Sequence, residues 1–328
     1  MSKVYYLKVA ESDKYEQILE QELKNKFKKG MKVAVKLHMG EDKGMFNPTL
    51  AKRTIKVLNK LGCEPFLFDT PVTYPGARES KQVYEKTAVK HGFTKESIGC
   101  PVIISDDYVG VKTKNLDLEV SKELLGADAF LVLTHFKGHP ASGMGGAIKN
   151  IAMGCVSPKS KKDQHTVGIP VVSDECTACG TCEEVCEYSA IKVKDKAVIN
   201  KNSCWACTTC VYNCPSNAIK SKASFDALMT EAASGILKKF DDKPVFYVND
   251  VRSITKNCDC FSNPGKIIAK DVGIFMSDNL VAVEKASTDL VKKQEGRDVF
   301  LETHHHDPYL QIKQAEKLGL GKEDYELT

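Results

Sequence analysis

Eight of the thirteen cysteines in this chain fall into two short runs that share one spacing. Each run, CTACGTCEEVC and then CWACTTCVYNC, has the form C-x2-C-x2-C-x3-C. The cysteines are Cys176, Cys179, Cys182 and Cys186 in the first run, and Cys204, Cys207, Cys210 and Cys214 in the second. Corresponding cysteines lie 28 positions apart (176 to 204, for example), as do Ala178 and Ala206. The segment is therefore an internal duplication.

This spacing suits iron–sulfur chemistry. Three closely spaced cysteines can wrap a tight loop around one cluster, while the fourth lies about one helical turn further on and reaches a second cluster. The runs resemble those of bacterial two-cluster ferredoxins, and Pro215 fits that pattern although Glu187 replaces its first proline. The resemblance implies one [4Fe–4S] cluster on Cys176, Cys179, Cys182 and Cys214, and a second on Cys204, Cys207, Cys210 and Cys186.

Zinc is the alternative metal for clustered cysteines. Zinc sites usually pair two C-x2-C elements, so two identical four-cysteine runs fit zinc badly. The N-terminus lacks the apolar stretch and cleavage site of a signal peptide. Thirteen cysteines without a secretion signal argue against a disulfide scaffold and indicate metal binding in a reducing compartment. We therefore expect a cytoplasmic protein, and oxygen-sensitive clusters would suit an anaerobic host.

The cysteine-rich segment interrupts a different kind of sequence. We place an inserted α+β ferredoxin-like domain at 171–221, with a short hairpin at 190–204 between its halves. The flanking parts, 1–170 and 222–328, form a discontinuous α/β host domain in which strand and helix patterns alternate. Such alternation predicts a mostly parallel sheet with helices on both faces. The predicted strands are VYYLKVA, MKVAVKLHM, EPFLFD, PVIISDD, AFLVLTHF, PVFYVND and IIAKDVGIFM.

Helices are predicted between these strands. The clearest signal is Asn47 before Pro48, a capping residue followed by a proline at the first turn. The other predicted helices are 13–30, ESKQVYEKTAVKHG, SFDALMTEAASGILKKF and NLVAVEKASTDLVKKQ.

Several unusual polar residues follow predicted strands of the host, where ligands bind in such sheets. Lys36 and His38 end one strand, and His135, Lys137 and His139 follow another. Because a core rarely needs His, Lys and His together, these residues are candidates for a site. The glycines of GMGGAIKN open a helix carrying Lys149, and they either cradle an anion or allow tight packing.

The remaining cysteines divide into two groups. Cys258 and Cys260 lie two apart, so on an extended backbone both thiols share a face. They can bind a further metal, act as thiolates that donate electrons, or be small buried hydrophobes. Cys155, with His165 nearby in sequence, raises the same alternatives. The apolar surroundings of Cys63 and Cys100 predict core positions for these two cysteines.

Charge and hydropathy exclude some functions. The net charge is +4 with no basic arm, which argues against nucleic-acid binding. No apolar run reaches the length of a membrane span. The basic run at 159–163 is predicted to be a solvated loop, and the histidines at 304–306 are predicted to be exposed.

The host segments also resemble a known family. VKLHMGE, HFKGHPASGMGGAIKNIAMGC, KSKKDQH, NCDCF and DVGIFMSDNLVAVEKASTDLV are similar to the domain-of-unknown-function family 362, whose members are described as iron–sulfur proteins. That resemblance covers nearly the whole chain, ferredoxin insertion included, and implies no particular substrate. GMGGAIKNIAMG is also similar to the glycine-lysine segment of nickel-pincer lactate racemases, which is a hint about fold only.

Three functions are compatible with these features. The first is an electron-transfer protein whose clusters exchange single electrons with a redox partner protein. The second is a reductase in which the clusters supply a host pocket, where histidines and lysines protonate or hold a small molecule. The third is a metal or cofactor carrier that uses Cys258 and Cys260. A flavin stays open as a further cofactor because flavins often pass electrons to such clusters, although no segment carries a flavin or nicotinamide fingerprint.

Overall fold

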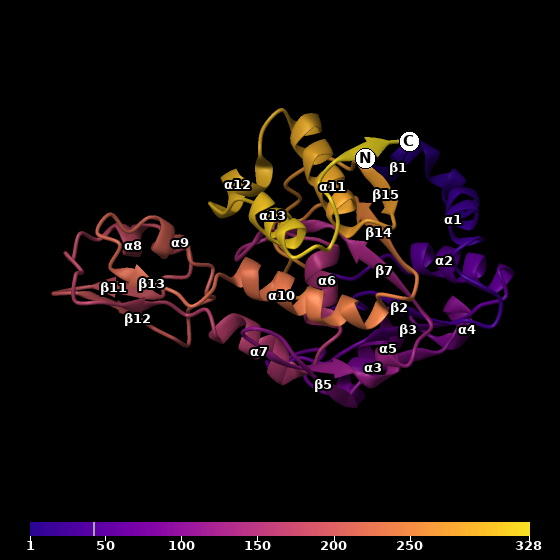
Figure 1. Ribbon diagram of the computed structural model, residues 1–328, viewed down its shortest axis with the longest axis horizontal. Helices are drawn as coiled ribbons and strands as arrows, with labels where there is room; N and C mark the ends of the chain where they lie inside the picture. The colour runs from indigo at the N-terminus through magenta and orange to yellow at the C-terminus, as the bar shows by residue number, and fades with distance from the viewer. Residues whose placement is uncertain (42) are drawn as a thin grey trace.

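The computed structural model describes residues 1–41 and 43–328. Its centre is an eight-stranded sheet of order β16-β1-β15-β14-β7-β2-β3-β4 (Figure 1). The strands are β1 (Ser2–Lys8), β2 (Lys32–Lys36), β3 (Glu64–Asp69), β4 (Val102–Ile104), β7 (Ala129–His135), β14 (Val245–Val251), β15 (Gly273–Ser277) and β16 (Tyr325–Leu327). Neighbours from β4 to β14 are parallel, and β15 runs antiparallel to β14 and β1. The predicted mostly parallel α/β sheet is confirmed.

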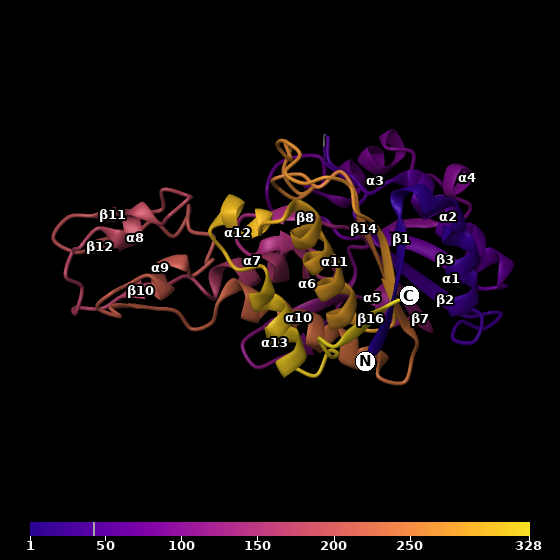
Figure 2. The same cartoon turned by 90° about the horizontal axis from the view of Figure 1, so that it is seen from above.

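Helices cover both faces of this sheet (Figures 1 and 2). One face carries α1 (Tyr15–Leu23), α2 (Pro48–Lys60), α3 (Lys81–Lys90) and α4 (Lys95–Ile98). The other carries α6 (Ala147–Gly154), α10 (Phe225–Leu237), α11 (Leu280–Glu295) and α13 (Tyr309–Lys317). Successive residues of β7 pack on opposite faces of the sheet. Leu131 and Leu133 lie in the core under α1 to α4, whereas Phe130 and Val132 lie in the core under α6, α10, α11 and α13. A strand buried on both faces reads as continuous hydrophobic sequence.

Local sequence signals explain where elements begin. Asn47 caps α2, because its side-chain oxygen accepts the backbone N–H of Thr49 at 2.9 Å, and Pro48 occupies the first turn as predicted. The predicted helix at 13–30 is shorter in the structure, where a 3₁₀ turn (Val9–Lys14) precedes α1. A second 3₁₀ turn (Lys238–Phe240) extends α10.

Several shorter elements were not predicted. Two hairpins pair β5 (Tyr108–Lys112) with β6 (Asp117–Ser121), and β8 (Lys137–His139) with β9 (Gly143–Gly145). Short helices are α5 (Lys122–Leu125) and α12 (Val299–His304). The prediction that the basic run at 159–163 forms a solvated loop is wrong. The run lies in helix α7 (Pro158–Thr166), which is capped by Ser157 and begins at Pro158. Lys161 of this helix is buried.

Residues 171–220 project from one end of the α/β unit in both views (Figures 1 and 2). They contain two small antiparallel sheets, β10 (Val171–Val172) with β13 (Ile219–Lys220), and β11 (Ile191–Val193) with β12 (Ala197–Ile199). Two single-turn helices, α8 (Thr181–Glu184) and α9 (Thr209–Tyr212), carry the middle of each cysteine run. The segment's own core holds only Cys182, Ile191, Ala197, Cys210 and Ile219 as buried members.

The duplication in the projecting segment extends to its backbone. Left-handed φ values recur 28 positions apart: 52° at Ala178 and 54° at Ala206, then 48° at Ser189 and 54° at Asn217. Such values are uncommon outside glycine, so both halves adopt the same costly turns.

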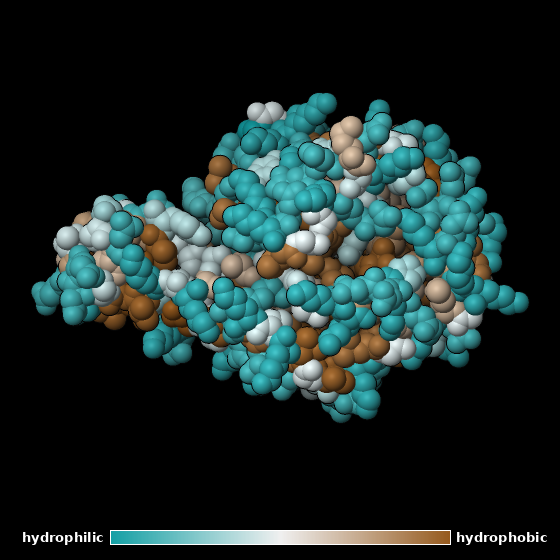
Figure 3. All heavy atoms as spheres, viewed as in Figure 1, coloured by the Kyte–Doolittle hydropathy of each residue, from teal (hydrophilic) through white to brown (hydrophobic). Residues whose placement is uncertain are grey.

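The surface is largely hydrophilic on the face drawn in Figure 3, with hydrophobic residues on the projecting segment. Val171, Val198 and Tyr212 are its exposed apolar side chains. Among the described residues, no helix combines the length and apolar character that crossing a membrane requires.

Candidate functional site

The carboxyl ends of the parallel strands open onto a cavity of about 530 Å³. Lys36 ends β2 and Asp69 ends β3, and the loop after β14 brings Cys260 to the same place. This is the edge at which ligands bind in parallel α/β sheets. Of the sequence-predicted candidates, the cavity collects Lys36, His38, His139, Lys149, His165 and Cys260.

Two buried ion pairs line the cavity. Lys36 Nζ lies 3.0 Å from Asp69 Oδ1, and Arg78 Nε lies 2.6 Å from Glu41 Oε1. Burial alone would raise the pKa of the Asp69 carboxyl, but the Lys36 ammonium overrides that effect and holds it well below its usual range. The hydroxyl of Tyr84 also donates to Asp69. The charges of Lys36 and Arg78 are therefore neutralised by carboxylates within the protein.

Lys149 differs from those two cations. Its Nζ lies 3.5 Å from Cys258 Sγ and 3.8 Å from Cys260 Sγ, and it pairs with no carboxylate among residues 1–41 and 43–328. Desolvation, followed by the repulsion of Arg78, lowers the pKa of Lys149 to about 7. The cavity therefore contains an ammonium group whose charge is available to a ligand near neutral pH.

Three histidines of the cavity are held neutral. Burial lowers the pKa of His38 and of His165 to about 4, and that of His139 well below its usual value. Nε2 of His38 and Nδ1 of His165 have no hydrogen-bond partner within the described part of the chain. Buried polar atoms are rarely left without a partner, so these nitrogens are suited to contacting a ligand.

A smaller cavity of about 60 Å³ adjoins the large one and shares His38, Lys149, Asn150 and Cys260 with it. His135 and Lys137 line this smaller cavity, and both interact with the buried carboxylate of Asp259. His135 Nδ1 is 3.0 Å from Asp259 Oδ2. The carboxylate thus neutralises Lys137, and its own pKa lies well below the usual range because Lys137 and His135 outweigh the effect of burial.

Cys258 and Cys260 are joined to each other as a disulfide between the two cavities. A ring nitrogen of His139 lies within 4.8 Å of both sulfurs, which makes these three residues a possible ligand set for a soft metal once the sulfurs are reduced. Cys258 is buried, whereas Cys260 is partly exposed and lines both cavities.

The glycine-rich turn does not offer a free anion cradle. The Glu284 carboxylate occupies the N-terminus of α6, where it accepts the backbone N–H of Ala147 at 2.7 Å. A side chain at Gly146 would overlap this carboxylate, so the glycine is needed for close packing. Of the two interpretations of these glycines, the structure therefore favours packing.

The other candidates lie elsewhere. Cys155 lines neither cavity but is buried in the core at the C-terminal end of α6, where burial raises the pKa of its thiol to about 12. Cys63 and Cys100 are buried in the other core, as predicted. The prediction that the histidines at 304–306 are exposed is wrong for two of them: His304 and His306 are buried, and only the middle one is exposed. His306 Nε2 lies 2.8 Å from Asp226, an internal partner that the sequence could not reveal.

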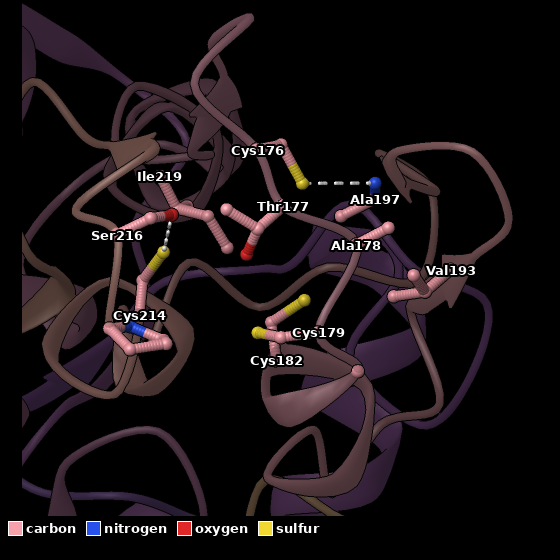
Figure 4. Close-up of a pocket in the computed structure, with 12 residues that line it drawn as sticks. Cys176, Thr177, Ala178, Cys179, Cys182, Val193, Ala197, Cys214, Ser216 and Ile219 are labelled. Atoms are coloured by element: carbon pink, nitrogen blue, oxygen red, sulfur yellow. Dashed lines mark hydrogen bonds between the residues drawn. The ribbon is translucent and has the colours of Figure 1, made fainter.

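The eight cysteines of the duplicated runs gather around two hollows, and all eight are free thiols. Each hollow is lined by three cysteines of one run and the last cysteine of the other. The first set is Cys176, Cys179, Cys182 and Cys214 (Figure 4), and the second is Cys186, Cys204, Cys207 and Cys210.

Backbone amides approach these sulfurs. The N–H of Ala197 lies 3.5 Å from Cys176 Sγ, and the N–H of Ala206 lies 3.4 Å from Cys204 Sγ. Hydrogen bonds of this kind to cysteine sulfurs tune the properties of a metal cluster that the sulfurs hold.

Trp205 connects the second hollow with the large cavity, because its side chain lines both. Its indole is stacked with the ring of Tyr188, at a centroid distance of 5.2 Å, and with the ring of Phe261, at 5.4 Å, with 9° between the planes in each pair. His165 meets the indole edge to face at 5.5 Å. A continuous aromatic stack therefore runs from the second cysteine hollow to the residue that follows Cys260.

The sequence profile described as "Domain of unknown function (DUF362)" matches residues 33–289. This chain belongs to the DUF362 family. No curated protein matches the sequence. The DUF362 chain is similar to a crystal structure of a Thermotoga maritima protein, with 14% identity and a TM-score of 0.50 over 95% of this chain and 61% of that one. This likeness concerns the fold alone.

A second similar structure is the lactate racemase apoprotein from Thermoanaerobacterium thermosaccharolyticum, with 13% identity and a TM-score of 0.38 over 77% of the DUF362 chain and 51% of that chain. The DUF362 chain thus spans less than two thirds of the length of either solved protein.

The site contains residues that escaped the sequence analysis, among them Asp69, Arg78, Trp205 and Phe261. Two of them carried a usable signal. Asp69 ends a predicted strand, and Trp205 is the only tryptophan of the chain and stands between two run cysteines. Arg78 lies in a loop segment without a distinguishing pattern, and Phe261 reads as an ordinary apolar residue.

Proposed function

We propose that this protein is an iron–sulfur oxidoreductase that passes single electrons from two [4Fe–4S] clusters to a small anionic molecule in the large cavity. The observation that carries the proposal is the position of Trp205, whose side chain lines both the second cysteine hollow and the cavity. A protein that only exchanged electrons with a partner would not need a cavity of about 530 Å³ beside its cysteine sites. This volume is typical of small-molecule sites.

The residues of the inserted domain, which we place at 171–221, fit two clusters. Its eight cysteines are free thiols in two groups of four, with amide donors beside the sulfurs. Its apolar core is very small, and segments of this size usually need metals or disulfides to fold. When bound, the clusters would supply single electrons at low potential.

The two sites would differ in their place along the electron route. Cys207 and Trp205 pack against the host core, so the second site, with Cys186, Cys204, Cys207 and Cys210, lies next to the cavity. The first site is lined by residues of β11 and β12, which Figure 1 shows at the far end of the projecting segment. We call the first hollow the far site and the second hollow the near site. A redox partner protein would therefore deliver electrons at the far site, and the near site would face the substrate.

The charge of the cavity favours an anionic substrate. Lys36 and Arg78 are neutralised by their carboxylate partners, whereas Lys149 has none among the described residues. An ammonium beside a carboxylate, sulfonate or phosphate forms a charge-assisted hydrogen bond. The unpartnered nitrogens of His38 and His165 can orient the ligand, and Lys149 can deliver a proton as the substrate is reduced.

The proposal is tested by anaerobic purification, followed by iron and sulfide analysis and EPR of the reduced protein. We expect about eight irons per chain and two interacting S = 1/2 signals. Adding sulfite and other small anionic oxidants to the reduced protein should then reoxidise the clusters faster in the wild type than in Lys149→Met. Stoichiometric zinc without iron would overturn the cluster assignment. Normal clusters with reoxidation that is insensitive to Lys149 would leave a pure electron carrier.

A metal carrier is the second candidate, because a His139 nitrogen and the sulfurs of Cys258 and Cys260 lie within 4.8 Å of one another. Trace-metal analysis of the same preparation tests it. A further stoichiometric metal that is lost from a Cys258→Ser, Cys260→Ser double variant would support a carrier or a metal-dependent reductase. We place either activity in the cytoplasm.

A further inference from the structure

We propose that Cys258 and Cys260 form a redox-active pair that collects two electrons at the edge of the cavity and holds them for the substrate. The inference rests on the proposed function only for the source of its electrons. It is carried by the position of the Cys258–Cys260 disulfide, which lies at the end of an aromatic stack that begins at the second cysteine hollow.

The pair stands apart from every other cysteine of the chain. The remaining eleven are free thiols, including eight in the duplicated runs, whereas these two are bonded to each other. Burial of Cys258 and partial exposure of Cys260 make the two sulfurs unequal. Only Cys260 lines the large cavity, so a substrate would meet this sulfur first. A structural disulfide has no need of such an opening.

The aromatic stack supplies a short route to the pair. Phe261 follows Cys260 in the chain and lies parallel to Trp205 at 5.4 Å, and Trp205 lines the hollow of the near cysteine site. Electron tunnelling weakens steeply with the gap between groups. Rings in contact therefore shorten the gaps that an electron must cross between the near site and Cys260.

The chemistry at the pair balances without a further reagent. The disulfide takes up two electrons, one from each reduced cluster, together with two protons; the S–S bond breaks and two S–H bonds form. One proton comes from the Lys149 ammonium, which contacts both sulfurs, and the other comes from solvent in the cavity. A neighbouring cation stabilises the thiolate through which such a reduction passes.

A site that holds two electrons links one-electron donors to a substrate that needs two electrons. Each cluster provides one electron at a time, whereas most organic reductions consume electrons in pairs. The reduced dithiol returns both electrons and both protons to the substrate and becomes a disulfide again. The substrate class is then a small anionic two-electron acceptor.

The test counts thiols at this pair in the cluster-loaded full chain. The protein is reduced anaerobically with stoichiometric dithionite, quenched in acid, alkylated with N-ethylmaleimide and analysed by mass spectrometry of the peptide containing Cys258 and Cys260. We expect no label before reduction and two labels after it. Phe261→Leu, which removes the stacked ring but no cysteine, should slow labelling at least tenfold. Tyr212→Ala, an exposed aromatic residue of the projecting segment outside the stack, should leave the rate unchanged.

The outcomes separate this inference from the proposed function, because cluster content and cluster reduction are read by iron analysis and EPR in the same samples. If the clusters are present and reduced but the pair stays unlabelled, the inference is overturned and the proposed function stands. Two labels before reduction, or a metal bound to the pair, also overturn it. Labelling at the wild-type rate in Phe261→Leu would contradict the proposed electron route through Trp205 and Phe261. Cys207→Ser, which lacks a near-site ligand, should keep the disulfide under dithionite; rapid labelling there would mean direct chemical reduction and overturn the inference.

Discussion

The indole of Trp205 lies parallel to the ring of Phe261, with ring centroids 5.4 Å apart. The two residues come from different parts of the fold, one from the second cysteine run and the other from the loop after β14. Their contact places the near cysteine hollow against a cavity lined by residues from the ends of β2 and β3. The projecting segment at 171–220 and the sheet unit therefore meet at this aromatic contact, and His165 meets the same indole edge to face.

The crossed grouping of cysteines has a direct consequence for iron content. We expect Cys214→Ser to lose the same cluster as Cys179→Ser, although these residues lie in different runs, because both line the first hollow. Cys186→Ser and Cys207→Ser should lose the other cluster. Each variant should retain about four irons. Cys214→Ser and Cys179→Ser should share one EPR spectrum, and Cys186→Ser and Cys207→Ser should share another. Cys63→Ser, in the host core, is the matched control and should retain about eight.

If Cys214→Ser instead gave the spectrum of Cys207→Ser, each run would bind its own cluster and the crossed assignment would be wrong. Serine is chosen because it nearly preserves the side-chain volume while weakening the metal bond.

Trp205, the only tryptophan of the chain, allows the near and far sites to be distinguished optically. Its emission should be quenched in the cluster-loaded protein, because an iron–sulfur cluster beside the indole absorbs the emitted energy. We expect Cys207→Ser to restore most of the emission, since this cysteine and Trp205 line the same hollow. Cys179→Ser, at the far hollow, should restore much less. Steady-state fluorescence at matched protein concentration measures this, and the reverse order would contradict the near and far assignment.

Anion binding in the cavity should depend on pH through Lys149. Only the ammonium form attracts an anion, and desolvation lowers the pKa of this group to about 7. The charged groups that act on it are Arg78, Lys137, Lys36 and Asp259. We therefore expect sulfate, which keeps its charge throughout, to bind more weakly as the pH rises from 6 to 8, in roughly the range in which this group titrates. Isothermal titration calorimetry gives the dissociation constant.

Lys149→Met should weaken sulfate binding about ten- to hundredfold at low pH, the loss expected for one charge-assisted hydrogen bond, and should remove the pH dependence. Lys159→Met is the control, because this lysine is exposed on α7 and pairs with Asp163 instead of lining the cavity. Unchanged affinity in Lys149→Met would refute the role given to Lys149.

Glu284 should make the host less stable as the pH rises. Its carboxyl is fully buried, and burial raises its pKa from 4.5 to about 7 even though it accepts the N–H of Ala147. A carboxyl with a raised folded-state pKa contributes stability that is complete below the unfolded pKa and is lost as the pH rises through the folded pKa. The loss between pH 4.5 and about 7 is about 3 kcal/mol.

Anaerobic urea unfolding between pH 5 and pH 8 measures the effect. The free energy of unfolding of Glu284→Gln should lack this part of the pH dependence, whereas the control Glu85→Gln, at an exposed position on α3, should follow the wild type. Parallel profiles for the wild type and Glu284→Gln would show that the buried carboxyl does not titrate in this range.

Much of this architecture could be predicted from local pattern. Alternating apolar segments predicted the sheet and its two helical layers, and Asn47 with Pro48 marked the start of α2. The predictions that failed involve local sequences whose environment is set elsewhere. The run at 159–163 reads as solvent-exposed, yet Lys161 is buried, and the carbonyl groups of Thr70 and Pro71 accept hydrogen bonds from its ammonium. His304 and His306 are likewise buried against distant partners.

By itself, the sequence determined which residues could do chemistry: the repeated cysteine spacing, the polar residues at strand ends and the closely spaced Cys258 and Cys260. Such signals are local, because they depend on side chains a few positions apart along one strand or turn. Only the tertiary structure decided that Trp205 would touch Phe261, that Lys149 would lie against two sulfurs, and that Glu284 would fill the start of α6. These contacts join residues separated by tens to more than a hundred positions, and packing of the whole sheet and its helices brings them together.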